Sequence, residues 1–269
     1  AGKEAMVKAI QQEIVLQKNY LAGQSLETIY FGGGTPSLLN SDELGAILQT
    51  IRRHFSVLEN AEITLEANPE DLTKAYLHAI QDLGINRLSI GIQSFQDRNL
   101  KFLNRNHSAD QSIQAIHDAQ AIGLTNISID LIYGLPDNSL GDLEHDILQA
   151  VETGVNHISA YSLTVEPKTV FGHQKKQGTF REVSETHMAT CFENTHALLE
   201  KHGFEAYETS NFAKNGHFSR HNTSYWNQEN YLGIGPAAHS FNQVSRQWNV
   251  SNNAAYVKQI AQGIIPAEV

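Results

Sequence analysis

Two hydrophobic periods alternate along the first 165 residues. Short β-rich runs predict strands at residues 27–31, 62–67, 87–94, 126–133 and 157–164. Between these runs apolar residues recur every three or four positions, as Leu44, Ile47, Leu48 and Ile51 do, which predicts amphipathic helices. Strands and helices that alternate at a spacing of about 30 residues form βαβ units, whose right-handed crossovers produce a parallel sheet. The pattern therefore predicts an α/β fold.

Polar residues at the helix starts support these boundaries. We expect Ser41 to cap the helix that contains Leu44. Asn68 and Pro69 suit the N-cap and first position of a third helix. Ser108 and Gln111 have the spacing of a capping box ahead of a fourth.

The regular alternation ends near residue 170. Lys175 and Lys176 precede a helix expected at residues 184–202, and the segment after it is rich in Asn, Ser, Tyr and Trp with weak periodicity. We therefore divide the chain into residues 1–170, the α/β part, and residues 171–269, a smaller C-terminal α+β region.

Composition narrows the function classes. The formal charge is −10, from 29 acidic and 19 basic residues, and the basic residues are scattered, which argues against a nucleic-acid partner. No run of about 18 apolar residues predicts a membrane segment, and the N-terminus lacks the pattern of a signal peptide. A single cysteine among 269 residues fits a cytoplasmic protein and excludes an iron–sulfur site built from this chain's cysteines alone.

Candidate chemistry gathers where the predicted strands end. The glycine-rich segment 32–35, Glu66, Gln93 and Asp130 each follow or close a strand, and the carboxyl ends of parallel strands meet at one edge of the sheet. Glycine exposes backbone groups to a ligand, and carboxylates can bind ribose hydroxyls or an ammonium group. Arg105 could bind a ligand carboxylate in a bidentate manner. We expect the strand interiors to be apolar, with these polar groups at the rim.

Structural roles remain open for the same residues. The glycine-rich segment has neither the Gly-Lys-Ser/Thr of a P-loop nor Gly-x-Gly-x-x-Gly, so it could be only a tight turn. Glu66 could help to cap the following helix. Asp130 lies in an apolar strand, where a carboxylate is tolerated only when it is paired.

Four motifs together resemble the radical SAM family. They are Tyr-Phe-Gly-Gly-Gly-Thr-Pro-Ser at 30–37, Glu-Ala-Asn-Pro at 66–69, Ser-Ile-Gly-Ile-Gln-Ser-Phe at 89–95 and Asp-Leu-Ile-Tyr-Gly-Leu-Pro at 130–136. They are most similar to the branch that holds oxygen-independent coproporphyrinogen III oxidase and the HemW heme chaperones. The resemblance implies a partial (β/α)6 TIM-like barrel that binds S-adenosylmethionine. It also implies site roles: Gly33, Gly34 and Thr35 at the methionine end, Glu66 at its amino group, Arg105 at its carboxylate, and Gln93 and Asp130 at the ribose.

The family's cluster ligands are absent from this sequence. Members bind a [4Fe-4S] cluster through Cys-x3-Cys-x2-Cys after the first strand, and here Cys191 is the only cysteine. Its place beside Phe192 on a predicted helix indicates core packing. We expect the chain to lack the first barrel strand and the end of the C-terminal region, so that the cluster belongs to the full-length protein.

A second motif favours heme chemistry. His-Asn-Thr-Ser-Tyr-Trp at residues 221–226 matches the His-Asn-x-x-Tyr-Trp motif of the HemW-like branch, and a neutral imidazole beside aromatic rings suits heme. The resemblance thus implies a chaperone that binds heme through His221, near Tyr225 and Trp226, and delivers it to hemoproteins of the respiratory chain, which include membrane-associated ones. His221 could equally be an ordinary hydrogen-bonded histidine.

The alternative function is an oxidase that converts propionates to vinyl groups. That branch tends to have Asp-His-Phe-Ala where residues 210–213 read Ser-Asn-Phe-Ala, which disfavours it. The oligomeric state stays open.

Overall fold

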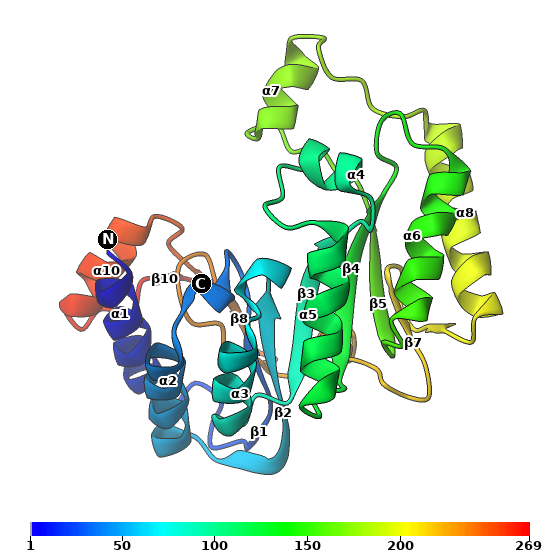
Figure 1. Ribbon diagram of the computed structural model, residues 1–269. Helices are drawn as coiled ribbons and strands as arrows, with labels where there is room; N and C mark the ends of the chain where they lie inside the picture. The colour runs from blue at the N-terminus through cyan, green and yellow to red at the C-terminus, as the bar shows by residue number, and fades with distance from the viewer. Residues whose placement is uncertain (1) are drawn as a thin grey trace.

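A computed structural model describes residues 2–269 and contains one large and one small sheet (Figure 1). The first part alternates strands with helices: α1 (Lys3–Leu16), β1 (Leu26–Phe31), η1 (Pro36–Leu38), α2 (Ser41–His54), β2 (Val57–Ala67), η2 (Pro69–Asp71), α3 (Lys74–Asp82), β3 (Arg87–Gln93), α4 (Asp97–Phe102), α5 (Ala109–Ala121), β4 (Ile127–Tyr133), α6 (Leu140–Glu152) and β5 (His157–Ser162). The second part contains α7 (Val170–Lys176), α8 (Glu185–Lys201), β6 (Glu205–Ala206), β7 (Asn211–Ala213), α9 (Arg220–Trp226), β8 (His239–Phe241), β9 (Arg246–Asn249), α10 (Asn253–Ala261) and β10 (Ala267–Glu268).

The large sheet confirms the predicted parallel core. Strands β1 to β5 are parallel neighbours in chain order, and all five overlap the predicted runs, although β2 starts earlier than predicted, at Val57. Next to β5 the sheet is completed by β7 and then β6, both antiparallel, so it continues past the boundary drawn at residue 170. Among residues 2–269, β1 has β2 as its one strand neighbour and forms the edge of the sheet.

The strands do not have apolar interiors on both faces, contrary to the sequence expectation. Alternate residues, such as Leu88, Ile90 and Ile92 of β3, pack into the main core beneath α2, α3, α5, α6 and α8. Polar residues lie between them: in β4 and β5 Ser128 bonds to the ring of His157, with 2.7 Å between Oγ and Nδ1. Polar side chains on the other face therefore also occur inside the strands, and not only at their carboxyl ends.

Three helix boundaries test the predicted caps. The capping box of Ser108 and Gln111 is confirmed. The cap of α2 is Asn40 rather than Ser41, because the Asn40 side chain accepts the amide of Glu43 and Ser41 is already helical. The third predicted helix is two elements, since η2 ends at Asp71 and α3 starts from its own N-cap, Thr73. Asn68 and Pro69 do occupy the predicted N-cap and first positions, but of η2, and the Asn68 side chain makes no capping hydrogen bond and is available for other contacts.

A buried carboxylate joins the two ends of the chain. Glu13 of α1 is fully buried, and its Oε2 accepts the amide of Gly235 at 2.8 Å and the hydroxyl of Tyr256. Its Oε1 accepts Asn249 Nδ2 at 2.7 Å and Gln17 Nε2 at 2.8 Å. Because both carboxylate oxygens accept hydrogen bonds, the cost of burying this side chain is offset. The contacts hold α1 against α10, which lies beside it in Figure 1, and bond it to Asn249 of β9.

Candidate functional site

Glu66 organises the glycine-rich segment after β1. Its Oε1 accepts the hydroxyl of Tyr30 at 2.7 Å, and its Oε2 accepts the amide of Gly33 at 3.0 Å. Gly33 and Gly34 have φ of +76° and +71°, a region that glycine adopts without strain. The alternative role of Glu66 as a helix cap is therefore not observed, and its carboxylate lies at the loop that the sequence predicts for a ligand.

Gln93, Asn68 and Arg105 lie together at the end of β3. Arg105 Nη1 donates to Asn68 Oδ1 at 3.3 Å. A Cβ on Gly91 would lie 2.9 Å from Gln93 Nε2, so glycine at this position makes room for that amide, and 3.7 Å from Asn68 Oδ1, an ordinary contact distance. Gln93 is buried and has a φ of +70°, unusual for a residue other than glycine. Such a conformation requires support from the surrounding structure.

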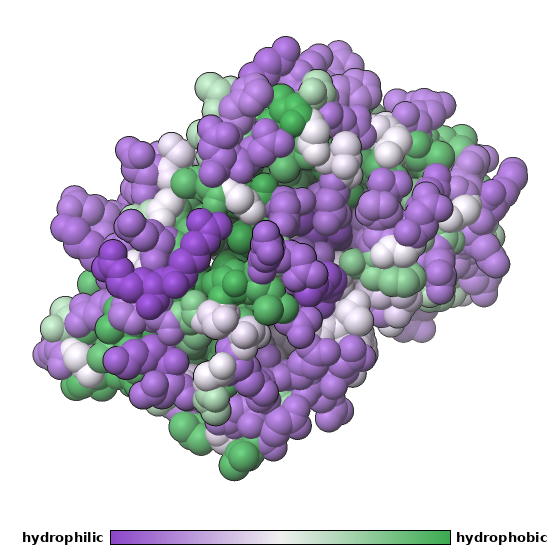
Figure 2. Space-filling model, turned by 90° about the horizontal axis from the view of Figure 1, so that it is seen from below, coloured by the Kyte–Doolittle hydropathy of each residue, from purple (hydrophilic) through white to green (hydrophobic). Residues whose placement is uncertain are grey.

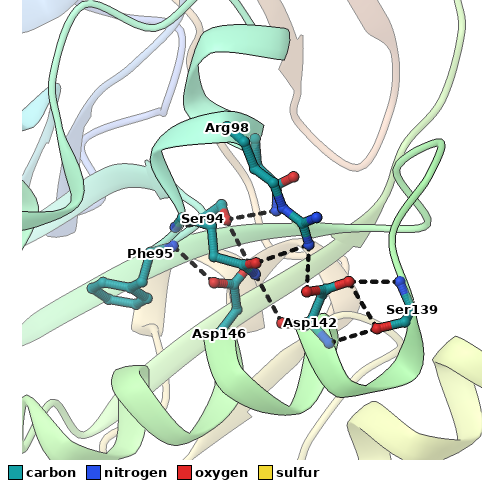
Figure 3. Close-up of polar contacts among 8 residues, drawn as sticks. Ser94, Phe95, Arg98, Ser139, Asp142 and Asp146 are labelled. Carbon is teal, nitrogen blue, oxygen red and sulfur yellow. Dashed lines mark hydrogen bonds and ion pairs between the residues drawn. The ribbon is translucent and has the colours of Figure 1, made fainter.

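That support comes from α6 (Figure 3). Asp146, 5% exposed, accepts Ser94 Oγ at 2.6 Å and the Phe95 amide at 2.9 Å. On the same helix Asp142 forms an ion pair with Arg98 and accepts the amide of Ser139. The two carboxylates fix the loop directly after Gln93.

Asp130 lies on the polar face of β4, at the same level as Ser159 of β5. Burial, with a smaller effect of the nearby charge of Glu66, raises the pKa of its carboxyl group to about 7, although Ser159, Arg105 and Arg87 act to lower it. A carboxyl group with this pKa can accept or donate hydrogen bonds near neutral pH, which suits contact with hydroxyl groups.

His221 lies at the start of α9 and is held on several sides. Its Nδ1 is 3.0 Å from Thr28 Oγ1, its Nε2 is 3.1 Å from the Tyr225 hydroxyl, and its amide donates to Glu62 Oε1 at 3.0 Å. Its ring stacks on Tyr30 with 4.6 Å between centroids and 14° between planes. Burial lowers the pKa of the imidazole to about 4, so the ring is neutral at physiological pH.

A cleft of about 1640 Å³ links this histidine to the glycine-rich segment. Its lining includes Gly33, Thr35, His221 and Tyr225, together with apolar residues of α1, α2 and β1. On the face seen from below, apolar residues are exposed in a hollow with hydrophilic residues around it (Figure 2). Every residue of β1 lines the cleft, so it lies along the open edge of the large sheet.

The predicted residues thus form two groups. Gly33, Glu66, Gln93, Arg105 and Asp130 gather around the carboxyl ends of the strands. His221 and Tyr225 face the cleft, whereas Trp226 does not line it and is 66% exposed. Tyr30 contacts both groups, through Glu66 and through His221.

Cys191 is buried in α8, as expected for a packing residue. Within residues 2–269 no group of three or more His, Cys, Asp or Glu side chains is arranged to bind a metal ion. Because a [4Fe-4S] cluster needs three or four thiolates and this sequence has one, the residues present do not fit such a cluster.

Several supporting residues escaped the sequence analysis. His107 is buried, and its ring is 3.0 Å from Glu70 Oε2 and 3.1 Å from the carbonyl of Ile92, which ties the Arg105 loop to η2 and β3. Ser37 donates to Asp71 at 2.6 Å and so joins η1 to η2.

Comparison with known families identifies the architecture. Residues 4–150 match the model of the "Radical SAM superfamily". The structure is similar to coproporphyrinogen III oxidase (HemN) from Escherichia coli, with a TM-score of 0.85, 23% identity, and coverage of 99% of this chain and 64% of that one. At this identity the likeness concerns the fold.

Curated relatives are similar over nearly the whole chain. The heme chaperone HemW of Mycobacterium tuberculosis is 37% identical over 96% of this chain and 66% of its own length. HemW of Bacillus subtilis is 37% identical over 97% of this chain and 69% of its own. The chain therefore spans about two thirds of the length of these relatives. None of the helices in residues 2–269 has the length and apolar character needed to cross a bilayer.

Proposed function

Because this chain belongs to the radical SAM superfamily, we propose that it is the S-adenosylmethionine- and heme-binding part of a HemW-like heme chaperone. The observation that carries the proposal is His221, a neutral imidazole that lines a large, partly apolar cleft. Heme requires such a nitrogen for its iron and apolar walls for its macrocycle. Identity to the curated chaperones favours this function over the oxidase.

The residues at the strand ends fit S-adenosylmethionine. The Arg105 side chain makes one hydrogen bond, to Asn68, and within the described residues it has no ion pair, so its remaining donors can hold the methionine carboxylate. Glu66 has lone pairs beyond those used by Tyr30 and Gly33 and can hold the ammonium group. Gln93 and Asp130 would hold the ribose, while Gly33, Gly34 and Thr35 would face the methionine end. In this superfamily the bound cofactor supplies radical chemistry.

For heme, the chain's own residues would set the orientation of the imidazole. A proton on His221 Nδ1 can be donated to Thr28, which leaves the Nε2 lone pair for iron once it exchanges its contact with Tyr225. Trp226, which is exposed on α9, would lie near the bound heme. We assign residues 1–170 to the cofactor-binding barrel and 171–269 to the heme-associated region that supplies α9. The recipients would be hemoproteins of the respiratory chain.

Heme uptake against porphyrin turnover tests this function. A protein with the full length of the relatives, anaerobically reconstituted, is incubated with heme and separately with coproporphyrinogen III. We expect stoichiometric heme binding and no decarboxylated porphyrin. Accumulation of vinyl-bearing product would establish the oxidase instead.

The cofactor assignment has its own test. Asp130→Ala and Arg105→Ala should each weaken S-adenosylmethionine binding about ten- to a hundredfold, because each removes a hydrogen bond to a charged group worth about 1.5–3 kcal/mol. Calorimetry on both variants measures this. Unchanged affinity in both would mean that the ribose and carboxylate assignments are wrong.

A further inference from the structure

Tyr30 lies between the two candidate sites. Its hydroxyl donates to Glu66 Oε1 at 2.7 Å, and its ring stacks on the imidazole of His221 with 4.6 Å between centroids. One side chain therefore contacts both the carboxylate proposed for the ammonium group and the imidazole proposed for heme.

The position of this tyrosine is closely constrained. Gly32 leaves space for it, since a Cβ there would lie 2.4 Å from Tyr30 Cε1. The carboxylate that receives its hydroxyl is itself held by the amide of Gly33. A shift of the glycine-rich segment or of Glu66 therefore moves the ring that supports His221, because packed side chains have few alternative positions.

The imidazole is oriented mainly by the same strand. Thr28 and Tyr30 are both on β1, and together they contact Nδ1 and one face of the ring of His221. Glu62 of β2 holds the amides of Arg220 and His221 and so places the start of α9. The edge of the ring with Nε2 faces Tyr225, away from these contacts.

We propose, on the basis of the proposed function, that Tyr30 is a positioning residue that couples the methionine end of the cofactor site to the heme imidazole. An ammonium group that binds to the remaining lone pairs of Glu66 pulls on the carboxylate, which shifts the oxygen that accepts the Tyr30 hydroxyl and so changes the support of the His221 ring. Such coupling is reciprocal: heme must alter cofactor affinity by the same factor by which the cofactor alters heme affinity.

The test is a pair of titrations of the unmodified protein, residues 1–269. Heme is titrated with and without saturating S-adenosylmethionine, and the cofactor is titrated with and without heme. We expect each affinity to change about fivefold or more in the unmodified protein, by equal factors. Tyr30→Phe keeps the stacked ring and loses the hydroxyl, so the heme spectrum should persist while the coupling factor falls to one. Tyr30→Leu should also weaken heme binding.

Two further variants separate the possible failures. Tyr133→Phe removes a hydroxyl from a tyrosine packed against the opposite, helix-covered face of the sheet and should keep the coupling. His221→Ala should abolish the heme ligation spectrum; if it does not, the proposed heme site fails. If His221→Ala abolishes the spectrum but Tyr30→Phe retains full coupling, or the unmodified protein shows none, the role of Tyr30 is refuted and the heme site stands.

Discussion

The depressed pKa of His221 makes the stability of the folded chain depend on pH in a defined window. Its folded pKa is about 4 because of burial, against about 6.5 for an exposed histidine. Between these values the unfolded chain binds more protons, so the free energy of unfolding rises with pH. The contribution is complete above pH 6.5 and is lost as the pH falls to about 4.

The magnitude follows from the same two values. At about 1.4 kcal/mol per pH unit, the interval between 6.5 and about 4 corresponds to about 3 kcal/mol. The groups around the ring are Thr28 and Tyr30 of β1 and Tyr225 of α9, while the carboxylate of Glu62 bonds to the backbone amide. Within residues 2–269 no acidic side chain bonds to the ring nitrogens to offset the loss.

Urea unfolding of the unmodified chain and His221→Gln at several pH values from 4 to 7 measures this contribution. The difference in unfolding free energy between the two should shrink by about 3 kcal/mol as the pH falls through the window. His157, whose pKa burial also lowers, titrates in both proteins and cancels in the difference. His217→Gln serves as the matched control, since His217 does not line the cleft. A difference that stays constant with pH would refute the reasoning.

Two buried carboxylates, those of Asp146 and Glu13, give further predictions. Asp146→Ala leaves the Ser94 hydroxyl and the Phe95 amide without their acceptor and should cost about 2–4 kcal/mol of unfolding free energy in urea titrations. Because these contacts fix the loop after Gln93, S-adenosylmethionine binding should also weaken. Unaltered stability would contradict the described contacts. Glu13→Ala removes the acceptor of four hydrogen bonds, three of which come from the C-terminal segments, and should cost at least about 3 kcal/mol of unfolding free energy. Amide exchange at Gly235 should also become faster, and normal protection there would contradict the described contacts.

The five parallel strands could be predicted because each combines a β-rich run with a following amphipathic helix. The short strands β6 and β7, of two and three residues, are too short to show a period. Asn40 escaped detection because Ser41 beside it is an equally good cap by type, and the side-chain bond to Glu43 decides between them.

The positions of the candidate residues could be predicted where motifs end strands. Their side-chain contacts could not be predicted where the contacting residues are distant in sequence. Glu66 and Asp130 were identified by position, but the contact of Tyr30 with His221 joins residues 191 positions apart (221 − 30). The polar residues inside β3 to β5 were missed because isolated Ser, Gly and His residues in a short strand do not rule out an apolar strand interior. Register, which places Ser128 beside His157, exists only once the sheet has formed.

Coordination of heme by His221 is the central claim, and optical titration tests it most directly. Heme is added to the unmodified chain, to His221→Ala and to His217→Ala, and the Soret band is followed to saturation. We expect one heme per chain with a coordination-shifted band in the unmodified protein and in His217→Ala, and loss of that shift in His221→Ala, with only hydrophobic adsorption remaining. An unshifted titration in all three, or a shift that survives in His221→Ala, would contradict the account.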